Sequence, residues 1–278
     1  MANWTRLECE LIVKDYMAMY EHEMHGERYS KAEHRRQLQP RLNNRSEGSI
    51  EYKHQNISAV LIGLGFPYIS GYKPAGNYQS MLKSVVGSYL SANEEIVIAH
   101  SDKLVQTPSD VPKLIDWRTV LTDAPERLSQ TDKNRDCDFT PRKYNYLERE
   151  AANSRLGILG EQFILDYERN RLCYLRREDL AEEVEWTSQV KGDGAGYDIR
   201  SFDGEKDEEL FIEVKTTNSG KYQPFFVTDN EVEFSKTYAA QYAIYRVFQF
   251  RDMPRLFTLP GDLKDNANLW PKTYKVSF

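Results

Sequence analysis

The chain has 278 residues, of which 40% are hydrophobic and 29% charged, and it carries a formal net charge of -6. This length predicts two domains of ordinary size, each able to bury a core. No apolar stretch approaches the roughly 20 residues that a membrane-spanning helix needs, so we expect a soluble protein without a membrane partner.

The amino terminus and the cysteines indicate the compartment. The opening residues, MANWTRLECE, lack the charged and then apolar pattern of a secretory signal. Cys9, Cys137 and Cys173 are odd in number and far apart, which argues against a disulfide framework and against a zinc site. These features predict a cytoplasmic protein.

The acidic balance is unevenly distributed along the chain. A net negative charge disfavours DNA as a partner, because binding to phosphates needs clustered Lys and Arg. Most of the acidic excess, however, lies in residues 151–278, and the first half is almost neutral. An acidic catalytic domain is compatible with DNA when another part of the chain holds the nucleic acid.

Residues 1–100 are predicted to form a helical domain. Apolar residues recur at helical spacing in three stretches, at residues 4–20, 50–64 and 78–89. Asn77 is a suitable N-cap for the third helix. The tract 66–76 is rich in Pro and Gly and therefore separates the second helix from the third.

Residues 101–140 are rich in Asp, Pro, Thr and Lys, and only residues 113–121 among them have apolar content. This composition is typical of a linker. We therefore expect a domain boundary here, with a second domain over residues 141–278.

The second domain is predicted to be α/β (α+β), beginning with a long helix over residues 143–170. Runs of apolar, β-branched and aromatic residues predict four strands, at residues 196–202, 209–216, 225–228 and 242–250. Thr228 and Glu231 have the form of a capping box, which predicts a helix from there to about Ala240. The fold class is thus a helical N-terminal domain followed by a small mixed α/β domain.

The strands 196–202 and 209–216 are joined by a turn that contains glycine, as in a hairpin. A turn centred between residues 205 and 206 sets Asp198 opposite Glu213. Opposed residues of antiparallel strands point to the same face, with Cβ atoms roughly 4.5–5.5 Å apart. Since side chains alternate along a strand, Lys215 shares this face with Glu213.

We expect a cation to lie between these two carboxylates. Two carboxylates about 4 Å apart repel by on the order of 4 kcal/mol at an effective dielectric of about 20. A hard divalent ion with oxygen ligands, Mg²⁺ or Mn²⁺, would relieve the repulsion, and Lys215 could stabilise charge that develops on a phosphate. On spacing alone, a solvated sheet face is the alternative interpretation of these side chains.

Residues 141–262 resemble the NO VEIN carboxy-terminal family, which in turn resembles the restriction-endonuclease-like superfamily. The active site of that superfamily consists of PD, a gap and then (D/E)xK. Glu213-Val214-Lys215 matches the second element, and Tyr197-Asp198 matches the first without its Pro. The superfamily also commonly supplies an acidic residue from a preceding helix, where this chain has Glu161.

The resemblance implies a role for each of these residues. Asp198 and Glu213, with the main-chain carbonyl of Val214, would hold Mg²⁺. Lys215 would orient or polarise the attacking water and stabilise the transition state. Glu161 would support the metal or its waters, although a lone Glu on an amphipathic helix is equally often a surface residue.

The candidate DNA contacts lie mainly in the first half, in its one concentration of basic residues: Arg35, Arg36, Arg41, Arg45 and Lys53. Contact with the DNA backbone is one interpretation of this group, and a solvated helical face is the other. Residues 46–79 are similar to an amino-terminal module of restriction-type nucleases. Lys221, in the loop 216–221, is a further candidate contact, although that loop also has the composition of an ordinary turn.

These features together predict a Mg²⁺-dependent endodeoxyribonuclease that hydrolyses phosphodiester bonds in DNA. A role in bacterial restriction or antiphage defence is implied by the resemblance alone. One alternative is a non-catalytic module that binds nucleic acid or protein on a nuclease fold. Another is a regulatory subunit whose cutting depends on a further subunit of a defence system. Double-strand cleavage from one site per chain would imply a homodimer.

Overall fold

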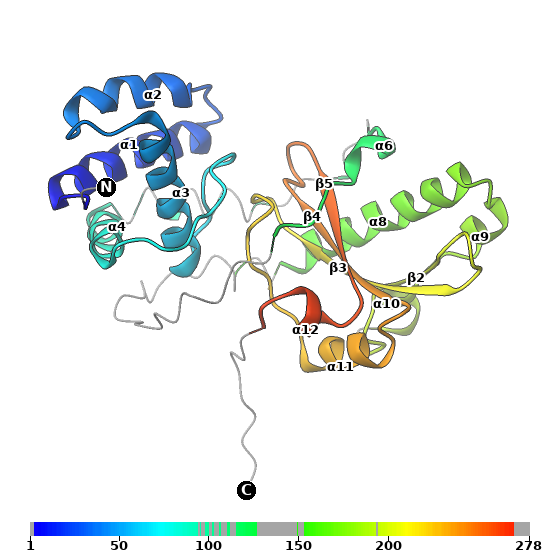
Figure 1. Ribbon diagram of the computed structural model, residues 1–278. Helices are drawn as coiled ribbons and strands as arrows, with labels where there is room; N and C mark the ends of the chain where they lie inside the picture. Colours follow the sequence, from blue (N-terminus) through cyan, green and yellow to red (C-terminus); the bar gives the residue numbers. More distant parts are fainter. Residues whose placement is uncertain are drawn as a thin grey trace, which may run out of the picture. The chain divides into compact units, whose positions relative to one another are not determined.

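The computed structural model describes residues 3–93, 115–126, 153–192 and 194–269, together with isolated residues between 95 and 149 (Figure 1). The chain forms two compact units. Unit 1 consists of residues 1–107, 129–153 and 218–224, and unit 2 consists of residues 108–128, 154–217 and 225–278. Among the described residues, no helix has the length and apolar character needed to cross a membrane.

Unit 1 is helical, as expected. Its helices are α1 (Arg6–His25), α2 (Lys31–Leu38), α3 (Glu47–Gly63) and α4 (Ser80–Ala92), with the short 3-10 helix η1 (Gln39–Arg41). The expected N-cap of α4 is wrong by two residues. Gln79 occupies the N-cap with an extended backbone, whereas Asn77 has a φ of 63°, outside the extended region that N-caps adopt.

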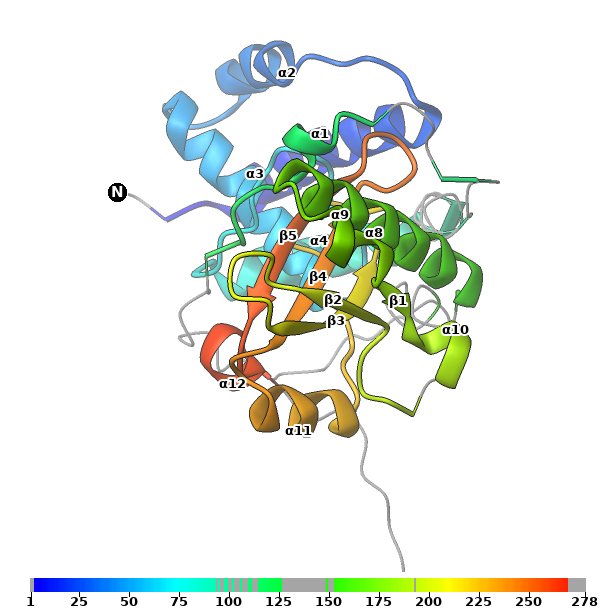
Figure 2. The same ribbon diagram turned by 90° about the vertical axis from the view of Figure 1, so that its right-hand side faces the viewer.

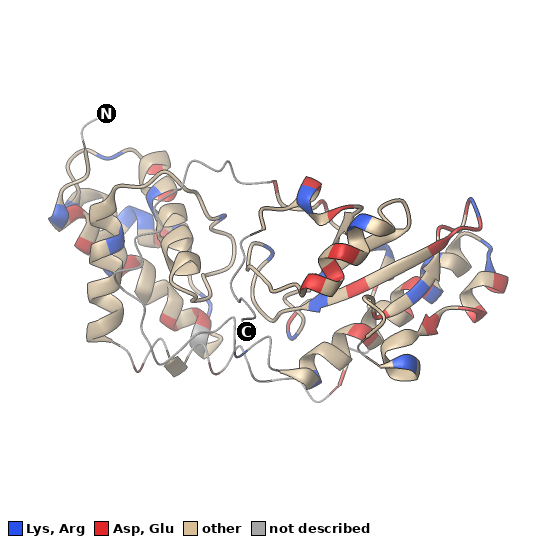
Figure 3. Ribbon diagram, turned by 90° about the horizontal axis from the view of Figure 1, so that it is seen from below, with Lys and Arg blue, Asp and Glu red and all other residues tan. Residues whose placement is uncertain are grey.

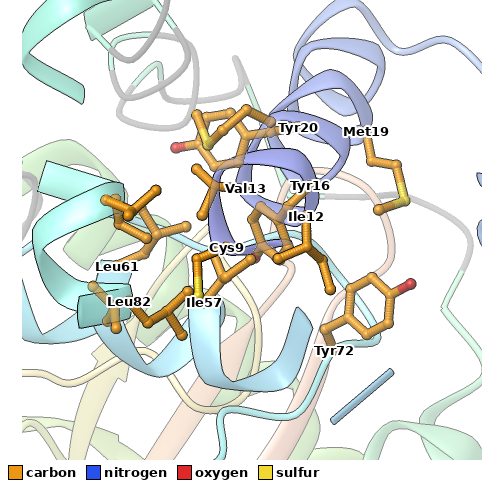
Figure 4. Packing of buried hydrophobic residues seen from close by; sticks show 14 of the residues in the cluster. Cys9, Ile12, Val13, Tyr16, Met19, Tyr20, Ile57, Leu61, Tyr72 and Leu82 are labelled. Atoms are coloured by element: carbon orange, nitrogen blue, oxygen red, sulfur yellow. The ribbon is translucent and has the colours of Figure 1, made fainter. Parts of the chain in front are cut away.

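The core of unit 1 forms between α1, α3 and α4 (Figure 4). Figure 4 shows Val13 and Tyr16 of α1 with Ile57 and Leu61 of α3 and Leu82 of α4, and all five side chains are buried. The apolar periodicity of these segments therefore marks the faces that pack together.

The tract 66–76 breaks the helical pattern as predicted, and side chains of α1 and α3 hold it in place. The Ile69 N–H donates to the hydroxyl of Tyr16 at 3.0 Å. The Ser70 N–H donates to the Glu23 carboxylate at 3.0 Å, and the Asn56 amide donates to the Ala75 carbonyl at 2.7 Å. Buried polar partners thus replace the backbone hydrogen bonds that a helix would have supplied.

Unit 2 is a five-stranded mixed sheet with helices on both faces. Its strands are β1 (Glu185–Trp186), β2 (Ile199–Phe202), β3 (Glu209–Thr216), β4 (Tyr242–Phe248) and β5 (Arg255–Pro260), in the order β1-β2-β3-β4-β5. Its helices are α6 (Trp117–Val120), α8 (Ser154–Tyr174), α9 (Glu178–Glu182), α10 (Thr187–Lys191), α11 (Asp229–Thr237) and α12 (Leu263–Asn266). Only β3 and β4 are parallel, and α11 lies between them in the chain.

Helices lie on both faces of the sheet (Figures 1 and 2), and apolar side chains pack on each face. On one face, α8 packs on Ile199, Ile212 and Val214. On the other, residues of α11 and α12 pack with Phe211 and Tyr242. We expected one apolar face on the hairpin, but Phe211 makes the second face apolar as well, and this second face also carries Glu213.

Several elements differ from the sequence prediction. Residues 225–228 form no strand; they precede α11 and its capping box, which is present as predicted. β1 and β5 were not predicted. The helix expected over 143–170 is described from Ser154 onward, and its earlier part lies outside the described residues apart from positions 149 and 153.

Part of the predicted linker belongs to unit 2. Val120 of α6 is buried in the core on the α8 face, and Leu121 forms a parallel bridge with Leu256 of β5. The Thr122 N–H donates to the Leu256 carbonyl at 2.8 Å. This stretch is therefore a structural element, which is consistent with its apolar content.

Candidate active site

The hairpin of β2 and β3 has the predicted register. Ile199 pairs with Ile212 and Arg200 with Phe211, so Asp198 comes next to Glu213 at the end of the ladder. Gly204 lies in the turn with a φ of 85°, a conformation that glycine adopts without strain. The local turn thus sets the position of the Asp relative to the Glu-x-Lys segment.

Asp198 is hydrogen-bonded to β3 through its side chain and its backbone. Its Oδ2 accepts a hydrogen bond from the Val214 N–H at 2.8 Å, and its own N–H donates to the Ile212 carbonyl at 2.9 Å. On β3, the Lys215 ammonium contacts Oε1 of Glu213 at 2.7 Å. The two carboxylates and the ammonium therefore come together at one end of the hairpin.

These side chains are not on a solvated surface. Glu213 is 6% exposed, and the Lys215 side chain is 19% exposed. The alternative of a solvated sheet face is therefore wrong. Burying like charges is costly, so both carboxyl groups respond by holding their protons more tightly.

The pKa values show this response. Burial, followed by the charge of Glu161, raises the pKa of Asp198 to about 7. Burial also raises the pKa of Glu213 well above its usual range, which Lys215 opposes and Asp198 reinforces. Burial lowers the pKa of Lys215, but the carboxylates of Glu213 and Glu231 outweigh it and raise that pKa to about 12. Lys215 is accordingly a permanent positive charge at neutral pH.

Glu161 of α8 lies beside Asp198. Its Oε2 accepts hydrogen bonds from the Trp186 indole at 2.6 Å and from the hydroxyl of Ser188. The backbone N–H of Ser188 donates to the Asp198 carbonyl at 3.1 Å. Ser188 thus connects Glu161 to the start of β2, so Glu161 is part of the site.

Gly160 explains how α8 brings Glu161 so close. A Cβ atom at Gly160 would lie 1.7 Å from Oγ1 and 2.8 Å from Cβ of Thr216 at the end of β3. No side chain fits between the helix and the strand at this point. The absence of a side chain at Gly160 allows the helix to approach the end of β3.

The sequence did not reveal three further residues of this face. Glu231, at the start of α11, lies 3.0 Å from the Lys215 ammonium. Arg246 of β4 pairs with Lys215 in the parallel ladder, is buried, and has its guanidinium 4.9 Å from the centre of the Phe225 ring. The third residue is Tyr242 of β4, which is also buried.

The Tyr242 hydroxyl is a buried polar atom without a hydrogen-bond partner among the described residues. Burial, and after it the charges of Glu213, Glu231 and Asp198, raises the pKa of this hydroxyl. The hydroxyl therefore lies near the carboxylates. An unsatisfied buried donor of this kind costs about 1–3 kcal/mol, and such groups mark functional sites more often than ordinary core positions.

The site suits a divalent cation by charge and by ligand type. Asp198, Glu213, Glu161 and Glu231 supply four carboxyl groups, and Lys215 contacts two of them directly, Glu213 and Glu231. In the described part of the chain, no group of three or more His, Cys, Asp or Glu side chains is preassembled as a metal site.

Two of the predicted DNA contacts, Arg45 and Lys53, make contacts within unit 1. The Arg45 side chain is 9% exposed and holds the Glu8 carboxylate with two nitrogens, at 2.7 and 2.8 Å. This contact lowers the pKa of Glu8 to about 2. Lys53 is buried with its ammonium 5.0 Å from the Trp4 ring centre. Both cations have partners inside unit 1, and DNA contact by them stays a prediction.

The other basic residues of unit 1 are more accessible. Arg36 is 71% exposed beside Glu33, and Arg41 is exposed. Arg35 is 25% exposed and contacts Glu47 at 2.9 Å. Both acidic and basic positions occur on this unit (Figure 3). DNA contact by these three residues stays a prediction.

Lys221 is half-buried within residues 218–224, which follow β3 but belong to unit 1. The neighbouring Tyr222 N–H donates to the Tyr68 hydroxyl at 3.0 Å. Asn218 and Ser219 are buried. This loop is therefore a packed segment, and phosphate contact by Lys221 also stays a prediction.

Comparison with known proteins finds one family. Residues 160–259 match the family described as Protein NO VEIN, C-terminal. The match runs from α8 to β5 and includes Glu161, Asp198, Glu213 and Lys215. The predicted resemblance is thus confirmed for these residues. No curated protein and no solved structure matches the chain.

Proposed function

We propose that the protein is a DNA endonuclease that depends on Mg²⁺ or Mn²⁺ and hydrolyses phosphodiester bonds. The observation that carries this proposal is the buried pair of carboxyl groups, Asp198 and Glu213, beside a permanently charged lysine. Titratable groups with strongly shifted pKa values concentrate at catalytic sites. Their ligand chemistry is that of hard divalent cations, which act on phosphates in many hydrolases.

Asp198 and Glu213, with the Val214 carbonyl, would hold the cation, which supplies Lewis acidity towards the phosphate and its nucleophile. Lys215 is charged at neutral pH, so it acts through its charge and its hydrogen-bond donors. It would orient the attacking water and stabilise the negative charge that grows on the phosphate oxygens. Glu161 lies beside Asp198, where its carboxylate can order water.

The order of elements supports assignment to the restriction-endonuclease-like superfamily. An acidic residue on a helix, an Asp at the start of a hairpin and a Glu-x-Lys segment on its second strand follow one another along the chain. The β3-α11-β4 crossover then adds a parallel strand. A role in restriction or antiphage defence, with DNA held by unit 1, is part of this proposal.

Cleavage assays test the proposal. The full-length protein is incubated with supercoiled plasmid, unmodified, methylated or hydroxymethylated, with Mg²⁺ or Mn²⁺. We expect nicking or cleavage that EDTA stops and that Lys215→Ala lowers more than about 100-fold, the usual effect of losing a preorganised charge. Lys236→Ala is the matched control, because Lys236 lies on α11 with its side chain exposed.

Equal cleavage rates of Lys215→Ala and wild type would contradict the proposed mechanism. DNA binding without cleavage under every condition would instead support the non-catalytic module. Cleavage that appears only with a co-purified protein would support the regulatory subunit.

A further inference from the structure

The first turn of α11 connects a helix cap to the candidate active site. Thr228 Oγ1 accepts from the Glu231 N–H at 3.2 Å, and Glu231 Oε2 accepts from the Thr228 N–H at 3.2 Å. This capping box fixes the Glu231 carboxylate at the helix start. The same Oε2 atom is 3.0 Å from the ammonium of Lys215, which lies on β3.

We infer that Glu231 is a positioning residue that holds the Lys215 ammonium in place for the reaction, an inference that rests on the proposed function. Lys215 has two anionic contacts, Glu213 at 2.7 Å and Glu231 at 3.0 Å. A cation held by Asp198 and Glu213 would compete with Lys215 for the Glu213 carboxylate. Glu231 is then the contact that keeps the ammonium in place.

The contacts of Glu231 favour this role over that of a metal ligand. Glu231 Oε2 already accepts from two donors, the Thr228 N–H and the Lys215 ammonium. Its own helix fixes the carboxylate, and 9% of the residue is exposed. A side chain with so little freedom is suited to orienting a long, flexible lysine, whose position is otherwise entropically costly to fix.

The capping box also supplies a variant that separates the two functions of Glu231. Glutamine serves as well as glutamate at this position of a capping box, because its carbonyl oxygen can accept from the Thr228 N–H. Glu231→Gln therefore retains the helix cap and removes the charge that faces Lys215. Glu233→Gln is the matched control, since Glu233 lies on the same helix with an exposed side chain.

The first experiment measures cleavage, Mn²⁺ affinity and thermal stability of the full-length variants. In Glu231→Gln we expect kcat to fall at least about tenfold, because misplacing a reacting group is costly, while the Kd for Mn²⁺ stays within about twofold. Glu233→Gln should match wild type in all three measurements. A parallel loss of Mn²⁺ affinity would make Glu231 a metal ligand, and an unchanged kcat would show that it is only a cap; either result overturns the inference.

The second experiment does not depend on nuclease activity. Lysines of the full-length protein are acetylated with limiting acetic anhydride, and the reactivity of each lysine is read by mass spectrometry. We expect Lys215 to react at least about threefold faster in Glu231→Gln than in wild type or Glu233→Gln, because a charge-assisted contact has been lost. Equal reactivity of Lys215 in the three proteins overturns the inference. If wild type cuts no DNA but Lys215 responds as expected, the proposed function fails and Glu231 still holds the ammonium.

Discussion

Unit 2 contains two buried charged clusters, one on each face of its sheet, and they are built differently. On the α8 face, Glu168 is fully buried, and its carboxylate accepts from two nitrogens of Arg171 at 2.7 and 2.9 Å. The Ser201 hydroxyl at 2.6 Å and the Tyr245 hydroxyl at 3.2 Å complete its hydrogen bonds. On the other face, two carboxyl groups with raised pKa values share one lysine with Glu231.

The comparison separates a buried charged cluster that stabilises the fold from one that does not. The Glu168 cluster is neutral as a whole, and a bidentate arginine with two hydroxyl donors stabilises its single carboxylate. The Asp198 cluster has more carboxyl groups than cationic groups, and the hydroxyl of Tyr242 in it lacks a partner among the described residues. Such an imbalance supports the proposal that a cation binds here.

The largest expected effect on stability comes from breaking the neutral cluster. Glu168→Gln removes the charge that Arg171 faces and leaves the guanidinium without its anion. We expect the free energy of unfolding to fall by about 2–4 kcal/mol, measured by urea denaturation at pH 7.5. Glu182→Gln, at an exposed position of α9, should change it by less than about 0.5 kcal/mol. Equal stability of the two variants would contradict the structural role of Glu168.

A smaller effect of opposite sign is expected in the unbalanced cluster. Asp198→Asn removes one of the repelling charges while its amide oxygen can still accept from the Val214 N–H. In protein treated with EDTA at pH 8, we expect the free energy of unfolding to rise by about 1–3 kcal/mol. Urea denaturation gives the value, and a clear loss of stability in this variant would contradict the account.

The pH dependence of wild-type stability follows from the same residue. The folded-state pKa of Asp198 is raised to about 7, above its usual value in an unfolded chain. The folded state therefore binds the proton more tightly, and this contribution to stability is present at low pH and lost as the pH rises through about 7. We expect EDTA-treated wild type to lose stability between pH 6 and pH 8, and Asp198→Asn to lose less.

Features that depend on neighbouring residues could be predicted from the sequence. The register of β2 and β3 follows from a glycine turn and the alternation of side chains, and the start of α11 follows from the capping box at Thr228. Both the predicted pair of Asp198 with Glu213 and the position of Lys215 depend on this register. The predicted part of the site is therefore its hairpin.

Features that depend on distant residues could not be predicted. Arg246 and Tyr242 join the site through the parallel pairing of β3 with β4, which the α11 crossover separates along the chain. The burial of Arg45 depends on Glu8, 37 positions earlier in the chain. The capping box does place Glu231 in the first turn of the crossover helix, where a glutamate can face the preceding strand, but we interpreted the capping box only as a helix start.

The binding of Mn²⁺ to purified full-length protein, measured by isothermal titration calorimetry, tests the central claim most directly. The account predicts that wild type and Glu168→Gln bind Mn²⁺ with similar affinity, and that Asp198→Asn binds it at least about tenfold more weakly. An absence of Mn²⁺ binding by wild type, or equal affinity in Asp198→Asn, would contradict it.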